Sequence, residues 1–216
     1  ALGDDKDSDV RKTAIDLLMK IGGAEARSAC IKALDTDTDK DVRNAAATSL
    51  GKIGGEQARS ALLKALDTDT DKDMREAAVT SLGQSLGQIG GEQARSACIK
   101  ALDTDTSGSV REAAAICLGH IGGEQARSAY IKALDTDTNE YVRRSAATSL
   151  GQIGVGQIGG EQARSACIKA LDADQHEDVR QAAADSLGKI GGEQARSACI
   201  KALEADTDED VRAAAA

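Results

Sequence analysis

The sequence is poor in the residues that fill large globular cores and stiffen loops. Its 216 residues include no Pro, no Phe and no Trp, and its only aromatic side chains are those of Tyr130 and Tyr141. A single core of this length normally uses aromatic bulk. The composition therefore favours thin layers of helices packed through Ala, Leu, Ile and Val.

Other shortages exclude whole classes of function. Lys and Arg number 27 against 36 Asp and Glu, a net charge of -9, whereas a nucleic-acid clamp needs the opposite balance. The chain has no apolar run of 18 residues that would predict a membrane span. The five cysteines form no C-x-x-C pair for zinc or redox work. We therefore expect no nucleic acid, no membrane and no metal as partners.

The sequence is rich in one repeated phrase. An Ile-Gly-Gly triplet recurs at spacings of 32, 36, 32, 37 and 32 residues, beginning at Ile21, Ile53, Ile89, Ile121, Ile158 and Ile190. Periods between 20 and 50 residues are typical of stacked arrays. We expect residues 1–216 to form a single array of units of about 32 residues, with insertions near 81–88 and 151–160.

Each unit predicts two helices joined by a tight turn. Residues from Asp41 to about Ile53 place apolar or small side chains on one face, and residues from Glu56 to about Asp67 form a second amphipathic pattern. Between the two patterns, Gly54 and Gly55 predict a left-handed helix end and a small start position.

The acidic segment before each first helix reads as a capping loop. The residue three before the Val-Arg anchor (Met-Arg in one unit) is a preferred N-cap in six units of seven: Asp7, Asp39, Asp71, Ser107, Asn139 and Asp208. His176 is the exception, and Asp174 is the alternative cap there. A calcium loop is the competing interpretation, but Lys40 and Ala46 stand where an EF-hand needs Gly and Glu.

Three motifs carry a family resemblance. A helix opening D-x-x-V-R-x-A-A-A, a helix end L-G-x-I-G and a second helix ending in L/I-K-A-L resemble HEAT-like repeats, of the variety found in phycobilin lyase subunits. The resemblance covers residues 1–216 and implies an all-α, right-handed α-solenoid of about six and a half helix pairs. It implies a protein-interaction or structural scaffold without catalysis or cofactor. The alternative is a phycobilin lyase-like or chaperone-like protein acting on phycobiliproteins.

Enzymatic relatives of this architecture fit less well. Deoxyhypusine hydroxylase uses His-Glu pairs from several repeats for its di-iron centre, and here only His176-Glu177 matches that pattern. HEAT-like DNA glycosylases are basic clamps with aromatic contacts, unlike this acidic chain. We therefore expect no catalytic residues.

The two insertions are local duplications with different predicted effects. Ser81 to Gln84 is repeated as Ser85 to Gln88. Four residues add about 400° of helix, so we expect the first helix of the third repeat to be one turn longer. The second insertion adds five residues and two glycines around Val155. About 500° of helix does not restore the face, so we expect a bulge or loop there.

Four of the cysteines stand at one repeated position, where other units carry Leu62 or Tyr130: Cys30, Cys98, Cys167 and Cys199. Cys therefore acts there as a small apolar residue. An odd number of unpaired thiols favours a reducing compartment, and we expect a cytoplasmic protein.

The second helices are nearly identical between units and are expected to line the concave side of the solenoid. They present two ladders that could bind an acidic or extended peptide: Ser60, Ser96, Ser128 and Ser165 beside Lys64, Lys100, Lys132 and Lys169. A solvated face of balanced charge is the other interpretation. Both chain ends fall inside a repeat, so we expect either a longer array or end-to-end stacking with a second copy.

Overall fold

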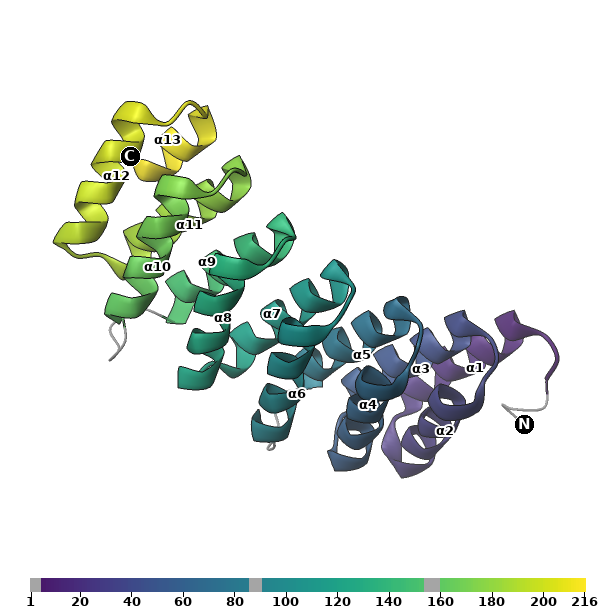
Figure 1. Cartoon of the computed structure of the whole chain (residues 1–216). Coiled ribbons are helices and arrows are strands. Elements are labelled where there is room, and N and C mark those ends of the chain that lie inside the picture. Colours follow the sequence, from purple (N-terminus) through teal and green to yellow (C-terminus); the bar gives the residue numbers. More distant parts are fainter. Residues whose placement is uncertain (1–4, 86–90, 154–159) are drawn as a thin grey trace. The chain divides into compact units, whose positions relative to one another are not determined.

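The structure is a computed structural model that describes residues 5–85, 91–153 and 160–216, and all regular secondary structure in these ranges is helical (Figure 1). The first helices of the units are α1 (Ser8–Ile21), α3 (Lys40–Ile53), α5 (Lys72–Ser85), α7 (Gly108–Ile121), α9 (Glu140–Ile153), α11 (Glu177–Ile190) and α13 (Glu209–Ala215). The second helices are α2 (Gly23–Thr36), α4 (Glu56–Thr68), α6 (Gly91–Thr104), α8 (Glu124–Thr136), α10 (Gly160–Ala173) and α12 (Glu193–Ala205). The predicted all-α repeat of helix pairs is confirmed.

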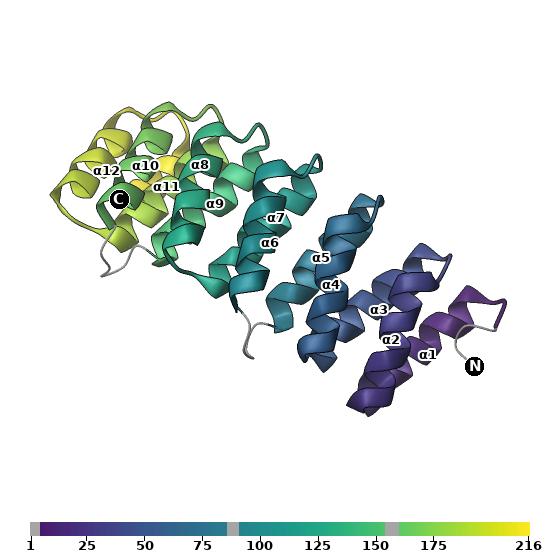
Figure 2. The same cartoon turned by 60° about the horizontal axis from the view of Figure 1, so that its bottom comes forward.

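The chain divides into two compact units, residues 1–101 and 102–216, with the boundary inside α6. In the first, α1, α3 and α5 pack in sequence as one layer, and α2 packs on α4 in the other. In the second, α7, α9, α11 and α13 form one layer, while α8, α10 and α12 form the other (Figure 2). The single array and its right-handed superhelix stay predictions.

The Ile-Gly-Gly turn has the predicted geometry. Gly54 ends α3 with φ +68° and donates its N–H to the Leu50 carbonyl at 2.9 Å, and Gly55 follows with φ +91°. L-residues with a side chain rarely adopt such positive φ values. The two glycines therefore allow the chain to reverse between the helices of one unit.

Most of the predicted N-caps are confirmed. Side-chain oxygens accept first-turn amides at five of the six preferred positions, namely Asp7, Asp39, Asp71, Asn139 and Asp208. Ser107 occupies the cap position, but its hydroxyl pairs with that of Ser109 at 3.0 Å, so a side-chain cap there was wrong. Asp174 was also wrong as a cap, because it accepts the N–H of His176 and no amide of the first turn of α11.

First helices approach one another closely through glycine. Val42, Ala46 and Leu50 of α3 are fully buried. A Cβ added at Gly51 would lie 2.8 Å from Ser81 Cβ of α5. The same contact recurs between Gly151 of α9 and Ser186 of α11, where an added Cβ would lie 2.5 Å from the Ser186 Oγ. The repeated Leu-Gly pair is therefore a packing motif of the first-helix layer.

The two tyrosines have opposite environments. Tyr130 is fully buried in the position that Cys holds in other units, and its hydroxyl donates to the Ala115 carbonyl of α7 at 2.7 Å. A buried hydroxyl needs such a partner. Tyr141, in the first turn of α9, is 46% exposed.

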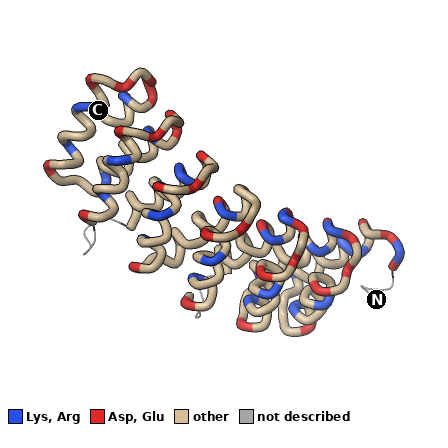
Figure 3. The backbone as a smooth tube through the Cα atoms, viewed as in Figure 1, with Lys and Arg blue, Asp and Glu red and all other residues tan. Residues whose placement is uncertain are grey.

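A ladder of Arg-Asp pairs joins successive units at the loops. In four first helices the guanidinium donates two hydrogen bonds to the carboxylate that follows the next second helix, in the pairs Arg11–Asp37, Arg111–Asp137, Arg143–Asp174 and Arg180–Asp206, at distances of 2.7 to 3.0 Å. In α3, Arg43 approaches Asp69 at 3.8 Å. The partners lie 26 residues apart in three pairs and 31 apart in Arg143–Asp174, which spans the five-residue insertion. Figure 3 shows the acidic residues gathered along these loops.

Both predicted consequences of the insertions lie outside the described residues. Helix α5 is described to Ser85, and the extra turn was expected in residues 86–89. Helix α9 is described to Ile153, and the bulge was expected near Val155. The two predictions stay open.

Candidate functional site

The predicted binding residues all lie on second helices with exposed side chains. The serines and lysines occupy α4, α6, α8 and α10, one Ser and one Lys per helix. Their regular placement follows from the repeat, because each Ser stands four residues before its Lys and i, i+4 side chains share a helix face. The sequence therefore placed these residues on one kind of surface. Its concave position stays a prediction.

Every lysine of this surface is already paired with a carboxylate of the preceding second helix. Lys64 contacts Asp35 at 2.9 Å, Lys132 contacts Asp103 at 3.0 Å, and Lys100 and Lys169 pair with Asp67 and Asp135. These side chains remain largely exposed; that of Lys169 is 68% accessible. Exposed pairs are worth about 0–1 kcal/mol. The lysines are thus partly neutralised, yet a ligand could displace their partners at little cost.

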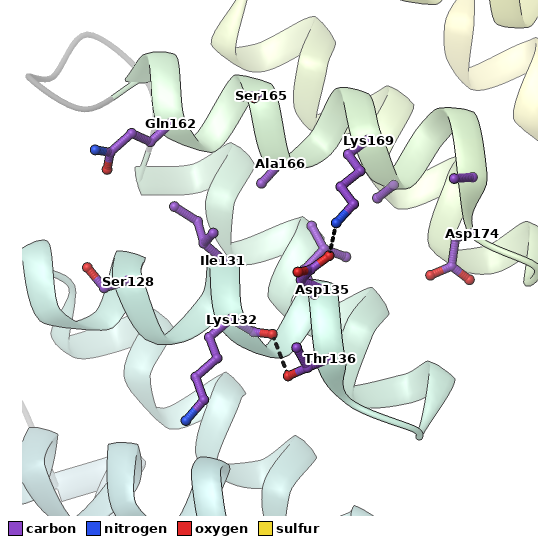
Figure 4. Close-up of a pocket in the computed structure, with 13 residues that line it drawn as sticks. Ser128, Ile131, Lys132, Asp135, Thr136, Gln162, Ser165, Ala166, Lys169 and Asp174 are labelled. Atoms are coloured by element: carbon purple, nitrogen blue, oxygen red, sulfur yellow. Dashed lines mark hydrogen bonds and ion pairs between the residues drawn. The ribbon is translucent and has the colours of Figure 1, made fainter.

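A groove of about 710 Å³ lies between α8 and α10 in the second unit (Figure 4). Four of the predicted residues line it: Ser128, Lys132, Ser165 and Lys169. The other four, on α4 and α6, do not. Half of the predicted residues therefore line one groove, between the second helices that flank the five-residue insertion in the sequence.

The floor of the groove is apolar. Its lining includes Ile131 and Leu134 of α8 and Ala166, Ala170 and Ala173 of α10, and Figure 4 shows Ile131 pointing toward Ala166. Alanine on one wall leaves the space, because its side chain ends at Cβ. Burial of apolar surface contributes about 25 cal/mol per Å², so an aliphatic side chain entering the groove would be stabilised.

The rim is polar and nearly neutral. In Figure 4 the Lys169 ammonium reaches toward Asp135, so one ion pair bridges the two helices beside the floor. Gln162 and Ser128 line the opposite end. Asp174 closes the groove at the loop; burial raises its pKa, but hydrogen bonds from Arg143 and the His176 amide outweigh burial and lower it. This carboxylate is therefore held ionised by the scaffold.

Two of the buried cysteines, Cys30 and Cys167, have thiols that are hard to ionise. Burial raises the pKa of the Cys30 thiol to about 11 and that of Cys167 to about 12. A nucleophilic Cys needs a lowered pKa. These thiols therefore serve as small apolar side chains, as the repeat position indicated.

The acidic loops are occupied by protein contacts. Asp37 accepts both the Arg11 guanidinium and the amide of Asp39, and Asp39 in turn accepts two amides of α3. Within the described ranges, His, Cys, Asp and Glu form no group of three suited to a metal ion. The calcium interpretation thus has no support from the geometry of these loops.

The apolar floor is the part of the site that the sequence interpretation missed. The sequence held no distinguishing signal: α10 ends in Ala173 where α2, α4, α6 and α8 end in Thr, but α12 ends in Ala205 as well. One substitution removes a hydroxyl from the groove wall. The repeat itself gave no reason to single out α8 and α10.

The described residues define a tandem-repeat protein of paired helices with a groove on its second-helix layer. The sequence model for HEAT repeats matches residues 1–83, 83–151 and 128–216. The chain belongs to the HEAT-repeat family. No curated protein sequence matches it at a significant level.

Solved structures share the fold. A chain of the CpcE–CpcF complex of phycocyanin lyase from Nostoc sp. PCC7120 has a TM-score of 0.57 and 24% identity, over 98% of this chain and 88% of that one. The archaeal HEAT-like repeats protein from Thermococcus onnurineus NA1 has a TM-score of 0.60 and 15% identity, over 95% and 89%. The Kap95:Nup1 complex gives 0.66 and 17%, with this chain spanning 33% of that chain. At these identities the likeness concerns the fold alone.

Membrane insertion has no helical candidate in the part of the chain that the structure describes. No helix there is both long enough and apolar enough to cross a bilayer.

Proposed function

We propose that this chain is a non-catalytic protein-interaction scaffold that binds an extended segment of a partner protein in the groove between α8 and α10. The observation that carries the proposal is the apolar floor of Ile131, Leu134 and Ala166 beside the exposed Lys169–Asp135 pair. An extended peptide could place alternate side chains on the floor while its backbone meets the polar rim. The solved relatives include complexes with protein partners, among them CpcE with CpcF and Kap95 with Nup1.

The groove can be tested with a display library of random 12-residue peptides selected on the purified chain. The blocking variant is Ala173→Arg, which places a long side chain in the groove. The matched control is Ala205→Arg, because Ala205 ends α12 as Ala173 ends α10 and does not line the groove. We expect selected peptides to bind Ala173→Arg at least tenfold more weakly and the control unchanged. Equal binding to both variants would contradict the proposal.

End-to-end association of copies is a second form of scaffold that a specific observation favours. Val10 and Leu17 are about half exposed and Ile21 is more so, whereas Val42, the counterpart of Val10, is fully buried by the preceding helix pair. At the other end, Ile200 is also about half exposed. Exposed apolar groups at both ends can cover one another between copies.

Light scattering over a concentration series tests this association. We expect the mass of the wild-type chain to rise with concentration, and Leu17→Ser, which restores the residue found at Ser49 and Ser149, to reduce the rise. A strict monomer at high concentration would rule out stacking and leave partner binding intact.

The alternative function, a phycobilin lyase-like role, has only the shared fold in its favour. Mixing the chain with a bilin and an apo-phycobiliprotein discriminates between the two functions. The scaffold proposal expects no absorbance shift and no pigment transfer. A transferred chromophore would overturn it.

A further inference from the structure

Two residues that differ from the other repeats stand out on the first helices of the compact unit formed by residues 102–216. Tyr141 occupies the position held by Asp in five other units, and Ile116 occupies the position held by Thr48, Thr80 and Thr148. Both side chains are exposed, by 46% and 51%. Because other units fold with Asp and Thr at these positions, folding does not require the exposed apolar groups.

Arg144 links Tyr141 to charged groups of two neighbouring first helices. Its guanidinium lies over the Tyr141 ring, 5.3 Å from the centroid, and reaches Glu112 of α7 at 3.8 Å and Asp178 of α11 at 4.0 Å. Glu112 and Ile116 stand four residues apart on α7 and so share its exposed face. We define Ile116, Tyr141, Arg144 and Glu112 as the first-helix patch.

The patch has the composition of a binding hot spot. Tyrosine and arginine dominate the energetics of protein interfaces, where they lie among groups that exclude water. The stacked guanidinium also restricts the Tyr141 ring before any partner arrives, which lowers the entropy cost of binding. The Tyr141 ring is therefore preorganised for binding.

Charge around the patch selects the partner. Glu112 and Asp178 lie beside Arg144, at 3.8 Å and 4.0 Å. Glu140 precedes Tyr141 in the chain and Glu177 precedes Asp178, so carboxylates outnumber the one guanidinium of the patch. The ion pairs of Arg144 are long, and His176 lies 4.0 Å from Glu140 and 3.9 Å from Glu177. These carboxylates are only loosely engaged within the protein. They can accept hydrogen bonds from a cationic partner.

We propose that the first-helix patch docks a second partner protein through a segment that carries Lys or Arg next to an aliphatic or aromatic side chain. The apolar side chain packs on Tyr141 and Ile116, and the cation meets the surrounding carboxylates. This surface lies on the first helices, whereas the groove lies on the second helices. The chain would then join two partners of different chemistry.

The test uses the same random 12-residue display library, with the full 216-residue chain as bait. The double variant Tyr141→Asp, Ile116→Thr gives both positions the residues of other units, so it should keep the fold. The matched control is the groove variant Ala173→Arg. We expect a class of peptides rich in Lys or Arg with an apolar neighbour, binding the double variant at least tenfold more weakly and Ala173→Arg unchanged.

The double variant separates docking from simple charge attraction. Tyr141→Asp adds a negative charge, so attraction alone would strengthen the binding of a basic peptide, whereas docking on the ring requires weaker binding. Unchanged or stronger binding to the double variant overturns the proposal, as does selection of acidic peptides or of none that discriminate. Loss of binding by Ala173→Arg alone would also overturn the proposal, because the basic peptides would then bind in the groove and not on this patch.

Discussion

The two layers of the second unit use the same repeat differently. First helices approach until only glycine fits, as at Gly151 against Ser186, whereas second helices leave a groove of about 710 Å³ between α8 and α10. Their ion pairs differ as well: the Arg180–Asp206 side chains are 15% and 10% exposed, while Lys201 is 68% exposed. The comparison indicates that the first-helix layer and its loops hold the stack together, and that the second-helix layer remains available for binding.

The largest expected effect comes from the buried pairs. Arg180→Gln leaves the Asp206 carboxylate buried without its fork of two hydrogen bonds, and removing one partner of a buried pair costs about 3 kcal/mol. Lys201→Gln breaks an exposed pair between neighbouring second helices and should cost less than about 1 kcal/mol. Urea unfolding midpoints measure both. Equal losses of stability in the two variants would contradict the proposed difference between the first-helix and second-helix layers.

A smaller effect is expected from filling the close contact between first helices. Gly151→Ala places a methyl group 2.5 Å from Ser186 Oγ, and overpacking of this kind costs about 1–3 kcal/mol. Gly188→Ala is the control, since nothing lies within 4 Å of a Cβ there, and the helix propensity of Ala should stabilise it by about 1 kcal/mol. Thermal melts of the two variants should move in opposite directions. If both were stabilised, the close approach would not limit packing.

The smallest expected effect is the loss of stability when acid protonates the carboxylate of an Arg–Asp pair. Hydrogen bonds from Arg11 and Arg180 lower the pKa of Asp37 and Asp206. The two ionised carboxylates contribute fully to the free energy of unfolding above the ordinary Asp pKa of about 3.9. This contribution is lost as pH falls through their lowered pKa. Stability measured by urea unfolding should therefore fall between pH 5 and pH 2, and less steeply in Arg180→Gln. An identical slope in that variant would contradict the assignment.

Local features of the fold could be predicted from the sequence. The glycine turn and most N-caps depend on contacts two to four residues apart, so Gly54, Asp39 and Asn139 were identified correctly. Ser107 failed because a competing hydroxyl, that of Ser109, lies equally close. The sequence gives no indication of which cap prevails between two such neighbours.

Contacts between neighbouring repeats could not be predicted from the sequence in the same way. Lys64 and Asp35 are 29 residues apart, whereas the equivalent Lys169 and Asp135 are 34 apart, so pairing depends on how neighbouring helices superpose. The groove floor depends on the distance between α8 and α10, which no residue pattern encodes. The sequence therefore left two interpretations of the lysine ladder open, a surface for an acidic or extended peptide and a solvated face of balanced charge, and the structure places a carboxylate beside each of its lysines.

The unequal spacing of the Arg-Asp pairs has a consequence for protein engineering. Arg143 keeps its two hydrogen bonds to Asp174 although the sequence between them is five residues longer than in the other pairs, so this contact tolerates a longer α9–α10 connection. That connection is therefore a natural graft point. A reporter peptide or an epitope spliced there should leave the flanking modules aligned, which makes the array a candidate carrier for displayed sequences.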